Sequence, residues 1–142
     1  MIVSTRGRYA LYVLMDLAGQ GEGSYTALKD IAEQQGLSHK YVEGIMGTLS
    51  KAGLVEGVHG RGGGYRLTRP LGDYSLGEIL RLTEGDLAPV SCLEQGAETC
   101  ANAGVCRTRP VWDRLNQLIN DYLDSVTLED LIEERSGSDA EA

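Results

Sequence analysis

Three cysteines are the residues of this chain best suited to metal or redox chemistry. Cys92, Cys100 and Cys106 fall within fifteen residues, and the 142-residue sequence contains no other cysteine. An odd number of cysteines in a chain expected to be cytoplasmic does not indicate a disulfide framework. Thiolates are good metal ligands and nucleophiles. The dense spacing therefore predicts metal ligation or a redox switch.

A second group of candidate residues lies between Leu37 and Leu67. Ser38 is a predicted helix cap, and the positions that follow it show apolar residues at helical spacing, namely Tyr41, Val42, Ile45, Met46 and Leu49. Two short strand candidates then flank residues 57–64, of which five are glycine. A helix followed by a β-wing is expected of a winged helix-turn-helix, whose second helix enters a DNA major groove. The predicted fold class is mainly α with a small β-wing and a long C-terminal helix.

The outward face of the predicted recognition helix carries His39, Lys40, Glu43 and two glycines, Gly44 and Gly47. In the glycine-rich tip, Arg61 is the candidate cation for a narrow minor groove. The tip could instead be read as a nucleotide-binding phosphate loop. It lacks the Lys-Ser/Thr pair of such a loop, and no strand-to-helix unit surrounds it.

The charge distribution removes an objection to DNA binding. The net charge of −8 argues against a nucleic-acid partner, but residues 1–70 carry eight Lys/Arg and six Asp/Glu, whereas residues 71–142 carry five and fifteen. Local charge decides contact with a groove. The stretch 39–69 sets five cations against Glu43 and Glu56; the cations are Lys40, Lys51, Arg61, Arg66 and Arg69.

The segments that precede this unit are predicted to form helices that support it. Residues 5–19 predict a first helix with Ser4 as its cap, and Thr26 is expected to cap a second helix that Gly36 ends. Two short helices separated by a turn at Gly36 make the helix-turn-helix. Gly53 is expected to close the recognition helix.

After the wing, Ser75 and Glu78 predict a capping box for a fourth helix. Thr108 and Pro110 predict the start of a fifth, longer helix. Its apolar stripe could bury against its own domain or pair with a second copy; the stripe comprises Val111, Leu115, Leu118, Ile119, Tyr122 and Val126. Thr127 and Asp130 predict a capping box for a short last helix.

These elements divide the chain into four expected regions. They are a winged helix-turn-helix domain (1–84), a cysteine-containing sensor loop (85–107), a dimerisation region with a short terminal helix (108–135) and a disordered acidic tail (136–142). No apolar run is long enough to span a bilayer, and no signal peptide is indicated, so we expect a cytoplasmic protein without a membrane partner. No Ser/His/Asp set, paired histidines or cofactor loop indicates an enzyme.

The motifs taken together resemble the IscR/NsrR/CymR family of bacterial winged-helix transcription regulators. The resemblance rests on STRGRYAL near the N-terminus, LSHKYVEGIMGTLSKAGLV, the wing VHGRGGGYRL and the late VTLEDL, and it covers residues 2–133. It implies a homodimer formed through the long C-terminal helix, which reads a palindromic promoter operator. The implied DNA-binding residues are Ser38, His39, Lys40, Glu43, Gly44, His59 and Arg61.

The resemblance also implies a cofactor. Iron–sulfur members hold a cluster with three cysteines at positions that match Cys92, Cys100 and Cys106, and [2Fe–2S] is favoured here over [4Fe–4S]. The fourth ligand departs from the family, because Arg109 stands where a histidine is expected and Arg8 near where an acidic residue is expected. The histidines of the DNA-binding unit are expected to be too distant. Ser91, Glu94, Glu98 or Asn102 could complete the set, as could a partner subunit or an external thiol.

The residues, together with the resemblance, imply a transcription regulator, expected to be a repressor, in which the cluster senses iron, redox state or nitric oxide. One alternative keeps DNA binding but makes the cysteines a zinc site or a thiol–disulfide switch. Another is a cluster-free regulator controlled by a protein partner, and a protein-interaction adaptor would drop DNA binding altogether.

Overall fold

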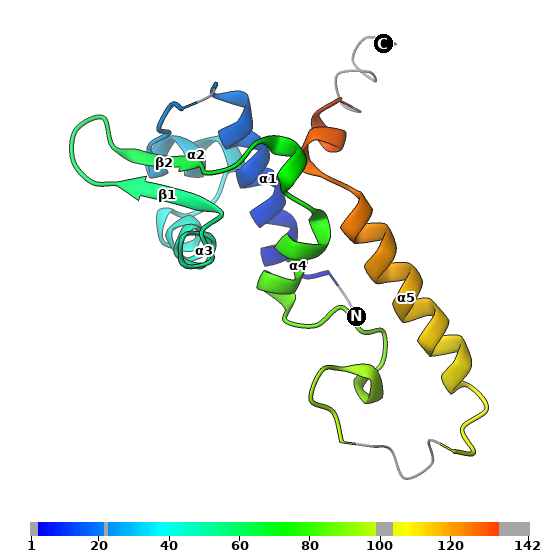
Figure 1. Cartoon of the computed structure of the whole chain (residues 1–142). Coiled ribbons are helices and arrows are strands. Elements are labelled where there is room, and N and C mark those ends of the chain that lie inside the picture. Colours follow the sequence, from blue (N-terminus) through cyan, green and yellow to red (C-terminus); the bar gives the residue numbers. More distant parts are fainter. Residues whose placement is uncertain (1–2, 22, 99–103, 134–142) are drawn as a thin grey trace.

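The first helix forms the centre of the body. A computed structural model describes residues 3–21, 23–98 and 104–133 of the chain. Helix α1 (Thr5–Gly19) begins after Ser4, whose side-chain oxygen accepts the backbone N–H of Gly7, which confirms the predicted cap. It contacts α2, α3, α4 and the wing strand β2 (Figure 1). Its buried apolar face consists of Ala10, Val13, Leu14 and Leu17.

Helices α2 (Leu28–Gln35) and α3 (His39–Lys51) form the helix-turn-helix. Gly36 has a φ of 65°, the left-handed conformation predicted for the helix end. The side-chain oxygen of Ser38 accepts the N–H of Tyr41 at 3.1 Å, as its predicted capping role requires. These two local signals fix the turn between the helices. The packing of α3 against α1 and α2 then sets the orientation of α3.

The wing is a two-stranded antiparallel sheet of β1 (Val55–Val58) and β2 (Gly64–Leu67). Val55 pairs with Leu67 and Val58 with Gly64, so residues 59–63 form the tip. The sheet projects away from the helical body (Figure 1). Its two strands therefore hold the tip at a distance from the core.

The predicted role of Thr26 as a helix cap is wrong. Ala27 is the capping residue of α2, and Thr26 forms an isolated bridge with Tyr65, in which each backbone N–H donates to the other residue's carbonyl at 2.9 Å. Thr26 is 7% exposed. The pairing with β2 outweighs the capping preference because it satisfies two backbone groups of a buried segment at once.

Helix α4 (Leu76–Glu84) follows a short 3₁₀ helix, η1 (Leu71–Asp73). The Ser75 side chain accepts the N–H of Glu78 at 3.1 Å, so half of the predicted capping box is present. The Glu78 carboxylate instead binds Arg69 at 2.8 and 3.1 Å. A charged partner is thus preferred to the neutral N–H that a full capping box would supply.

The fifth helix lies outside the body. Helix α5 (Arg109–Ser125) extends beside α4 and past it (Figure 1), and none of its residues is buried. Of the two alternatives for its apolar stripe, burial against its own domain is therefore not observed. The described part of the predicted loop, residues 85–98 and 104–107, contains a 3₁₀ helix, η2 (Ser91–Leu93).

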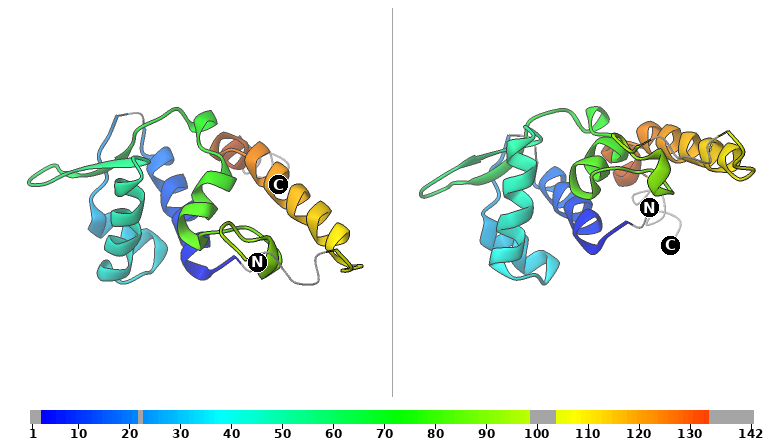
Figure 2. Two further views of the ribbon diagram at one scale, coloured as in Figure 1. Left: turned by 60° about the horizontal axis from the view of Figure 1, so that its bottom comes forward. Right: turned by 90° about the horizontal axis from the view of Figure 1, so that it is seen from below.

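After α5 the chain returns to the body. The predicted box is complete, since the Asp130 carboxylate accepts the N–H of Thr127 and the Thr127 hydroxyl accepts that of Asp130. Residues 128–133 are helical. Thr127 bridges to Ser75, and the Leu128 side chain is fully buried in the core cluster. Figure 2 shows this short terminal helix at the C-terminal end of α5, next to the body. The described helices include none long and apolar enough to cross a membrane.

Candidate nucleic-acid interface and sensor loop

Helix α3 presents one apolar and one polar face. Its buried residues are Val42, Ile45, Met46 and Leu49. The residues predicted to face DNA are all exposed; they are Ser38, His39, Lys40, Glu43 and Gly44. This division follows from the 3.6-residue period, which turns positions 39, 40, 43 and 44 away from the core. Tyr41 is partly buried against the core cluster, in edge-to-face contact with Tyr9.

The wing tip is a hydrogen-bonded turn of glycines with two side chains exposed. The N–H of Gly63 donates to the carbonyl of Gly60 at 3.1 Å, and a Cβ on Gly63 would lie 2.2 Å from the carbonyl oxygen of Val58. Glycine is therefore required there for space. His59 and Arg61 are exposed at the tip, where the sequence places the candidate minor-groove cation.

Two of the five cations counted in the helix-and-wing stretch are neutralised. Arg66 forms an ion pair with Glu56 and lies 4.6 Å from the ring centroid of Tyr25. Arg69 pairs with Glu78, and this carboxylate raises the pKa of the Arg69 guanidinium. The simple count of cations thus overstates the positive charge. The cations outside any ion pair among the described residues of this stretch are Lys40, Lys51 and Arg61.

The base of the wing is fixed by a buried tyrosine that the sequence analysis did not identify. The Tyr74 hydroxyl donates to the carbonyl oxygen of Leu54 at 2.6 Å and accepts the backbone N–H groups of Thr68 and Arg69 at 2.9 and 3.1 Å. Tyr74 is 0% exposed. It ties the chain entering the wing to the chain leaving it. The pairing of Thr26 with Tyr65 supports the same region from the side of α2.

The described cysteines lie at either end of the sensor loop. Cys92 is in η2 and Cys106 lies three residues before α5, and both are partly exposed. Cys100 and Asn102 lie outside the described residues, so the predicted convergence of three thiols stays a prediction. Within the described ranges no group of three or more His, Cys, Asp or Glu residues could hold a metal. His39 and His59 belong to α3 and the wing, on the other side of the body (Figure 1).

The Cys106 thiol has an environment that favours its thiolate. Its sulfur lies 3.4 Å from the Thr108 hydroxyl oxygen. That hydroxyl, then the backbone N–H groups of Thr108 and Arg109, and finally the Arg109 charge lower the pKa of Cys106. A thiolate is the form that binds metals and attacks disulfides. This environment therefore suits either of the chemistries predicted for the cysteines.

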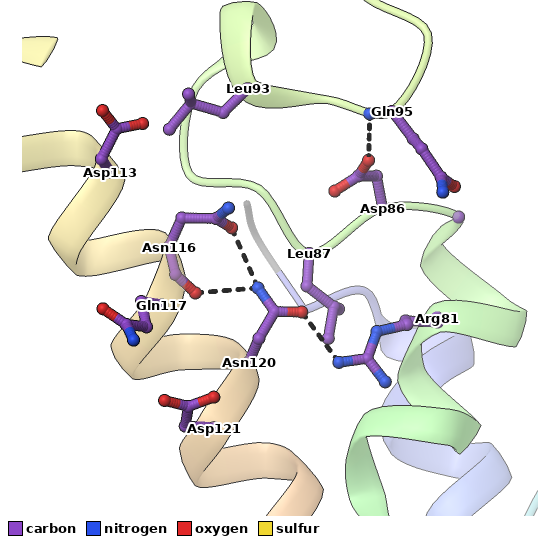
Figure 3. Close-up of a pocket in the computed structure, with 11 residues that line it drawn as sticks. Arg81, Asp86, Leu87, Leu93, Gln95, Asp113, Asn116, Gln117, Asn120 and Asp121 are labelled. Carbon is purple, nitrogen blue, oxygen red and sulfur yellow. Dashed lines mark hydrogen bonds between the residues drawn. The ribbon is translucent and has the colours of Figure 1, made fainter.

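The start of the loop is held by one carboxylate. Asp86 accepts the N–H of Ala88 at 2.8 Å and that of Gln95 at 2.6 Å, one on each oxygen. These hydrogen bonds, first Gln95 and then Ala88, lower the pKa of Asp86. Beside it is a pocket of about 500 Å³ between α4, the loop and α5 (Figure 3). Its lining residues are Arg81, Gly85, Asp86, Leu87, Leu93, Gln95, Asp113, Asn116, Gln117, Asn120 and Asp121.

A polar joint connects α5 to the body. The Arg81 guanidinium donates to both carboxylate oxygens of Asp124, at 2.7 and 2.9 Å, and to the side-chain oxygen of Asn120 at 2.8 Å. Asn120 also donates to Asn116 one turn earlier (Figure 3). The joint occupies the second half of α5. The pocket lies along α5 from Asp113 to Asp121, so it borders the joint at Asn120 and Arg81.

A helix-turn-helix with a wing, an exposed reading face and an outlying fifth helix defines the class of winged-helix DNA-binding regulators. Comparison with known proteins places the chain within that class. Residues 3–134 match the model of the Rrf2 family, described as an iron-dependent transcriptional regulator. The chain belongs to the Rrf2 family of transcription regulators, and the homologues in this family are not enzymes.

Relatives found by sequence and relatives found by structure each cover nearly the whole chain. A Neisseria meningitidis protein assigned as an HTH-type transcriptional regulator is 37% identical over 139 residues, which are 98% of this chain and 93% of the relative. The structure of CymR, the global cysteine regulator of B. subtilis, is 35% identical, with a TM-score of 0.77 over 94% of this chain and 98% of CymR. IscR of T. potens is 36% identical, with a TM-score of 0.73 over 95% and 88% of the two chains. These similarities confirm the expected family and fold class.

Proposed function

We propose that this regulator reads a palindromic promoter operator as a homodimer, with α3 in the major groove and the wing tip in the adjacent minor groove. The observation that carries the proposal is the exposed face of α3. Its polar residues are presented together while its apolar residues hold the helix in the core. Lys40 and Glu43 would contact base edges, where a carboxylate can accept from a cytosine amino group but is repelled by phosphate. The charge pattern supports the wing contact, because Arg61 is unpaired by any described carboxylate.

The proposed dimer uses the apolar stripe of α5. Four large apolar side chains of this helix are exposed; they are Val111 (59%), Leu115 (37%), Leu118 (48%) and Tyr122 (67%). They recur with spacings of four, three and four residues, so they form one stripe along the helix. A stripe of this length on an otherwise polar helix favours pairing with a second copy, since exposure to water costs free energy. Two-fold pairing would set two recognition helices against two half-sites.

The proposed sensor is an iron–sulfur cluster held by Cys92, Cys100 and Cys106. Thiolates are the donors that such clusters require, and the environment of Cys106 favours that form. When bound, the cluster would supply sensitivity to iron, redox state or nitric oxide. The chain's own residues would transmit its state, because Asp86 anchors the loop and Arg81 anchors α5. The description of the matched family as iron-dependent supports this assignment.

A second candidate sensor is a thiol–disulfide switch or a zinc site on the same cysteines. Arg109, at the position where cluster-binding relatives are expected to carry histidine, cannot ligate a metal and forms a loose ion pair with Asp113 at 3.8 Å. The similarity to a structure described as a global cysteine regulator also favours control by thiol chemistry. Repression of transcription is proposed for either sensor, since a protein bound across a promoter obstructs polymerase.

Selection from a pool of random DNA duplexes tests the DNA-binding proposal directly. Protein purified without oxygen should enrich a two-fold symmetric sequence, with half-sites centred about one helical turn apart. Enrichment of an asymmetric half-site only would contradict the dimer, and the absence of any enriched sequence would contradict sequence-specific reading. A pool selected in parallel with air-exposed protein shows whether the sensor state changes the choice of DNA.

A further inference from the structure

Arg6, on the first turn of α1, reaches the exposed surface of α3. Its Nη2 atom donates hydrogen bonds to the carbonyl oxygen of Gly44 at 3.2 Å and to Oγ1 of Thr48 at 2.8 Å. The Thr48 hydroxyl also donates to the Gly44 carbonyl, at 3.2 Å. A cation from the first helix is therefore held on the recognition helix by acceptors that carry no charge.

The guanidinium of Arg6 lies beside the exposed Gly44. A Cβ added to Gly44 would meet Nη1 of Arg6 at 3.9 Å, and no other described atom of the surroundings within 4 Å. The Arg6 side chain thus borders the space that a longer side chain at position 44 would fill. Gly44 is exposed and lies next to Glu43 on the face of α3 that the proposed function assigns to DNA. The guanidinium consequently lies at the edge of that face.

The charge of Arg6 is not neutralised by the protein. The ion pairs among the described residues engage Arg66, Arg69, Arg81 and Arg109, and no described carboxylate lies within ion-pair distance of Arg6. A guanidinium carries five N–H donors in a fixed fork. The hydrogen bonds to α3 come from Nη2, so Nε and Nη1 make none to the described residues. A guanidinium that is held in one orientation beside a recognition helix, without a paired carboxylate, is well suited to bind a phosphate group.

We propose that Arg6 is a further DNA-contacting residue, which donates to a phosphate oxygen at the edge of the groove that α3 enters. The proposal rests on the proposed function of α3. Because it links α1 and α3 through the same side chain, Arg6 would also fix the depth of α3 in the groove. A phosphate contact adds affinity for any sequence and carries no sequence information of its own.

The salt dependence of binding isolates this contact. The logarithm of the association constant falls with the logarithm of salt concentration by about 0.9 for each phosphate neutralised on B-DNA. Arg6→Gln keeps one amide donor for the Gly44 carbonyl and removes the charge. We expect it to bind both a random duplex and a selected operator several-fold more weakly, with a salt slope shallower by about 0.9 for each subunit, or about 1.8 for the bound dimer. Arg6→Lys should keep the slope, and the exposed Arg8→Gln on the same helix should match the wild type in both.

An unchanged slope in Arg6→Gln, or an equal change in Arg8→Gln, would overturn the proposal. A second measurement uses the wild-type protein and so does not depend on the folding of a variant. Phenylglyoxal modification, read by peptide mass spectrometry, should be slowed by DNA at Arg6 and not at Arg8. Equal reactivity of Arg6 with and without DNA would also overturn it. If the wild type shows no preference for any sequence, the proposed operator reading fails, while the slope on the random duplex still decides the role of Arg6.

Discussion

The guanidinium of Arg81 on α4 engages both carboxylate oxygens of Asp124 on α5, at 2.7 and 2.9 Å. The pairing lowers the pKa of Asp124 and raises that of Arg81, so both groups stay charged across the physiological range. This ion pair is partly exposed, and its worth in stability is modest. Its geometric effect is larger, since two parallel hydrogen bonds fix the angle at which α5 leaves the body.

The visible absorbance of the wild type and of cysteine variants discriminates between the candidate sensors. Protein purified anaerobically should be brown, with visible absorbance that is lost when Cys92, Cys100 or Cys106 is changed to Ala, because each thiolate is a proposed ligand. Gln95→Ala, an exposed position of the same loop that is not a candidate ligand, is the control that should keep the colour. A colourless anaerobic sample with stoichiometric zinc would contradict the iron–sulfur proposal.

The wing cation should contribute to DNA affinity. Arg61→Ala removes the exposed charge at the tip and should weaken binding to the selected operator several-fold, because a cation in the minor groove is attracted by its negative potential. Fluorescence anisotropy at physiological salt measures the affinity. Arg8→Ala, also an exposed arginine, should bind as the wild type does. Equal affinity of the Arg61 variant and the wild type would remove the wing tip from the contact set.

The apolar stripe of α5 should hold the dimer. Leu118→Glu places a charge in the proposed interface, where its burial is costly, and should give monomers at micromolar concentration. Sedimentation velocity reports the mass, and circular dichroism should show an unchanged body because Leu118 is 48% exposed within the chain. Gln117→Glu alters the charge of the neighbouring position by the same amount and should remain dimeric. A monomeric wild type would contradict the dimer proposal.

The hydroxyl of Tyr74 should stabilise the base of the wing. Tyr74→Phe leaves the Leu54 carbonyl and the N–H groups of Thr68 and Arg69 without this buried partner. We expect the free energy of unfolding to fall by about 1–3 kcal/mol, measured by urea denaturation. Tyr12→Phe is the matched control, since the Tyr12 side chain is 48% exposed. An equal stability of the two variants would show that the Tyr74 hydroxyl contributes nothing.

The anchoring of the sensor loop should weaken in acid. The pKa of Asp86 lies below its ordinary value of 3.8 in the folded protein, so its contribution is present above that value and is lost as the pH falls through the lowered pKa. Thermal stability between pH 5 and pH 2 should therefore decline less in Asp86→Asn than in the wild type. Asp121→Asn, which removes an exposed carboxylate of the same pocket, should decline as the wild type does.

The sequence predicted those elements whose signals are local. Ser4, Ser38 and the Thr127–Asp130 pair cap helices as expected, because each cap bonds to a residue three positions away. Gly36 ends α2 for a similarly local reason. The periodic apolar residues of α3 likewise gave the correct buried face. Short-range geometry is thus sufficient for these caps and for the buried face of α3.

The missed features depend on distant partners. Thr26 was expected to cap a helix, but Tyr65 pairs with it from 39 positions away. The engagement of α3 by Arg6 and the pairing of Arg66 with Glu56 also become visible only when the chain is folded. The spacing of the apolar residues predicts the stripe on α5. Whether other parts of the chain cover that stripe depends on where α5 lies in the fold. Charge counts and capping rules contain no information about such contacts.

The burial of Leu128 has a consequence for synthesis on the ribosome. Its backbone N–H donates to the carbonyl of Tyr74, and its side chain fills the core cluster built by residues 10–79. The winged-helix body therefore cannot close completely until residue 128 has emerged, by which time the cysteine loop has been translated. Contacts of such long sequence separation are formed late. The nascent chain thus completes its winged-helix body only after the three cysteines of the proposed sensor have been translated.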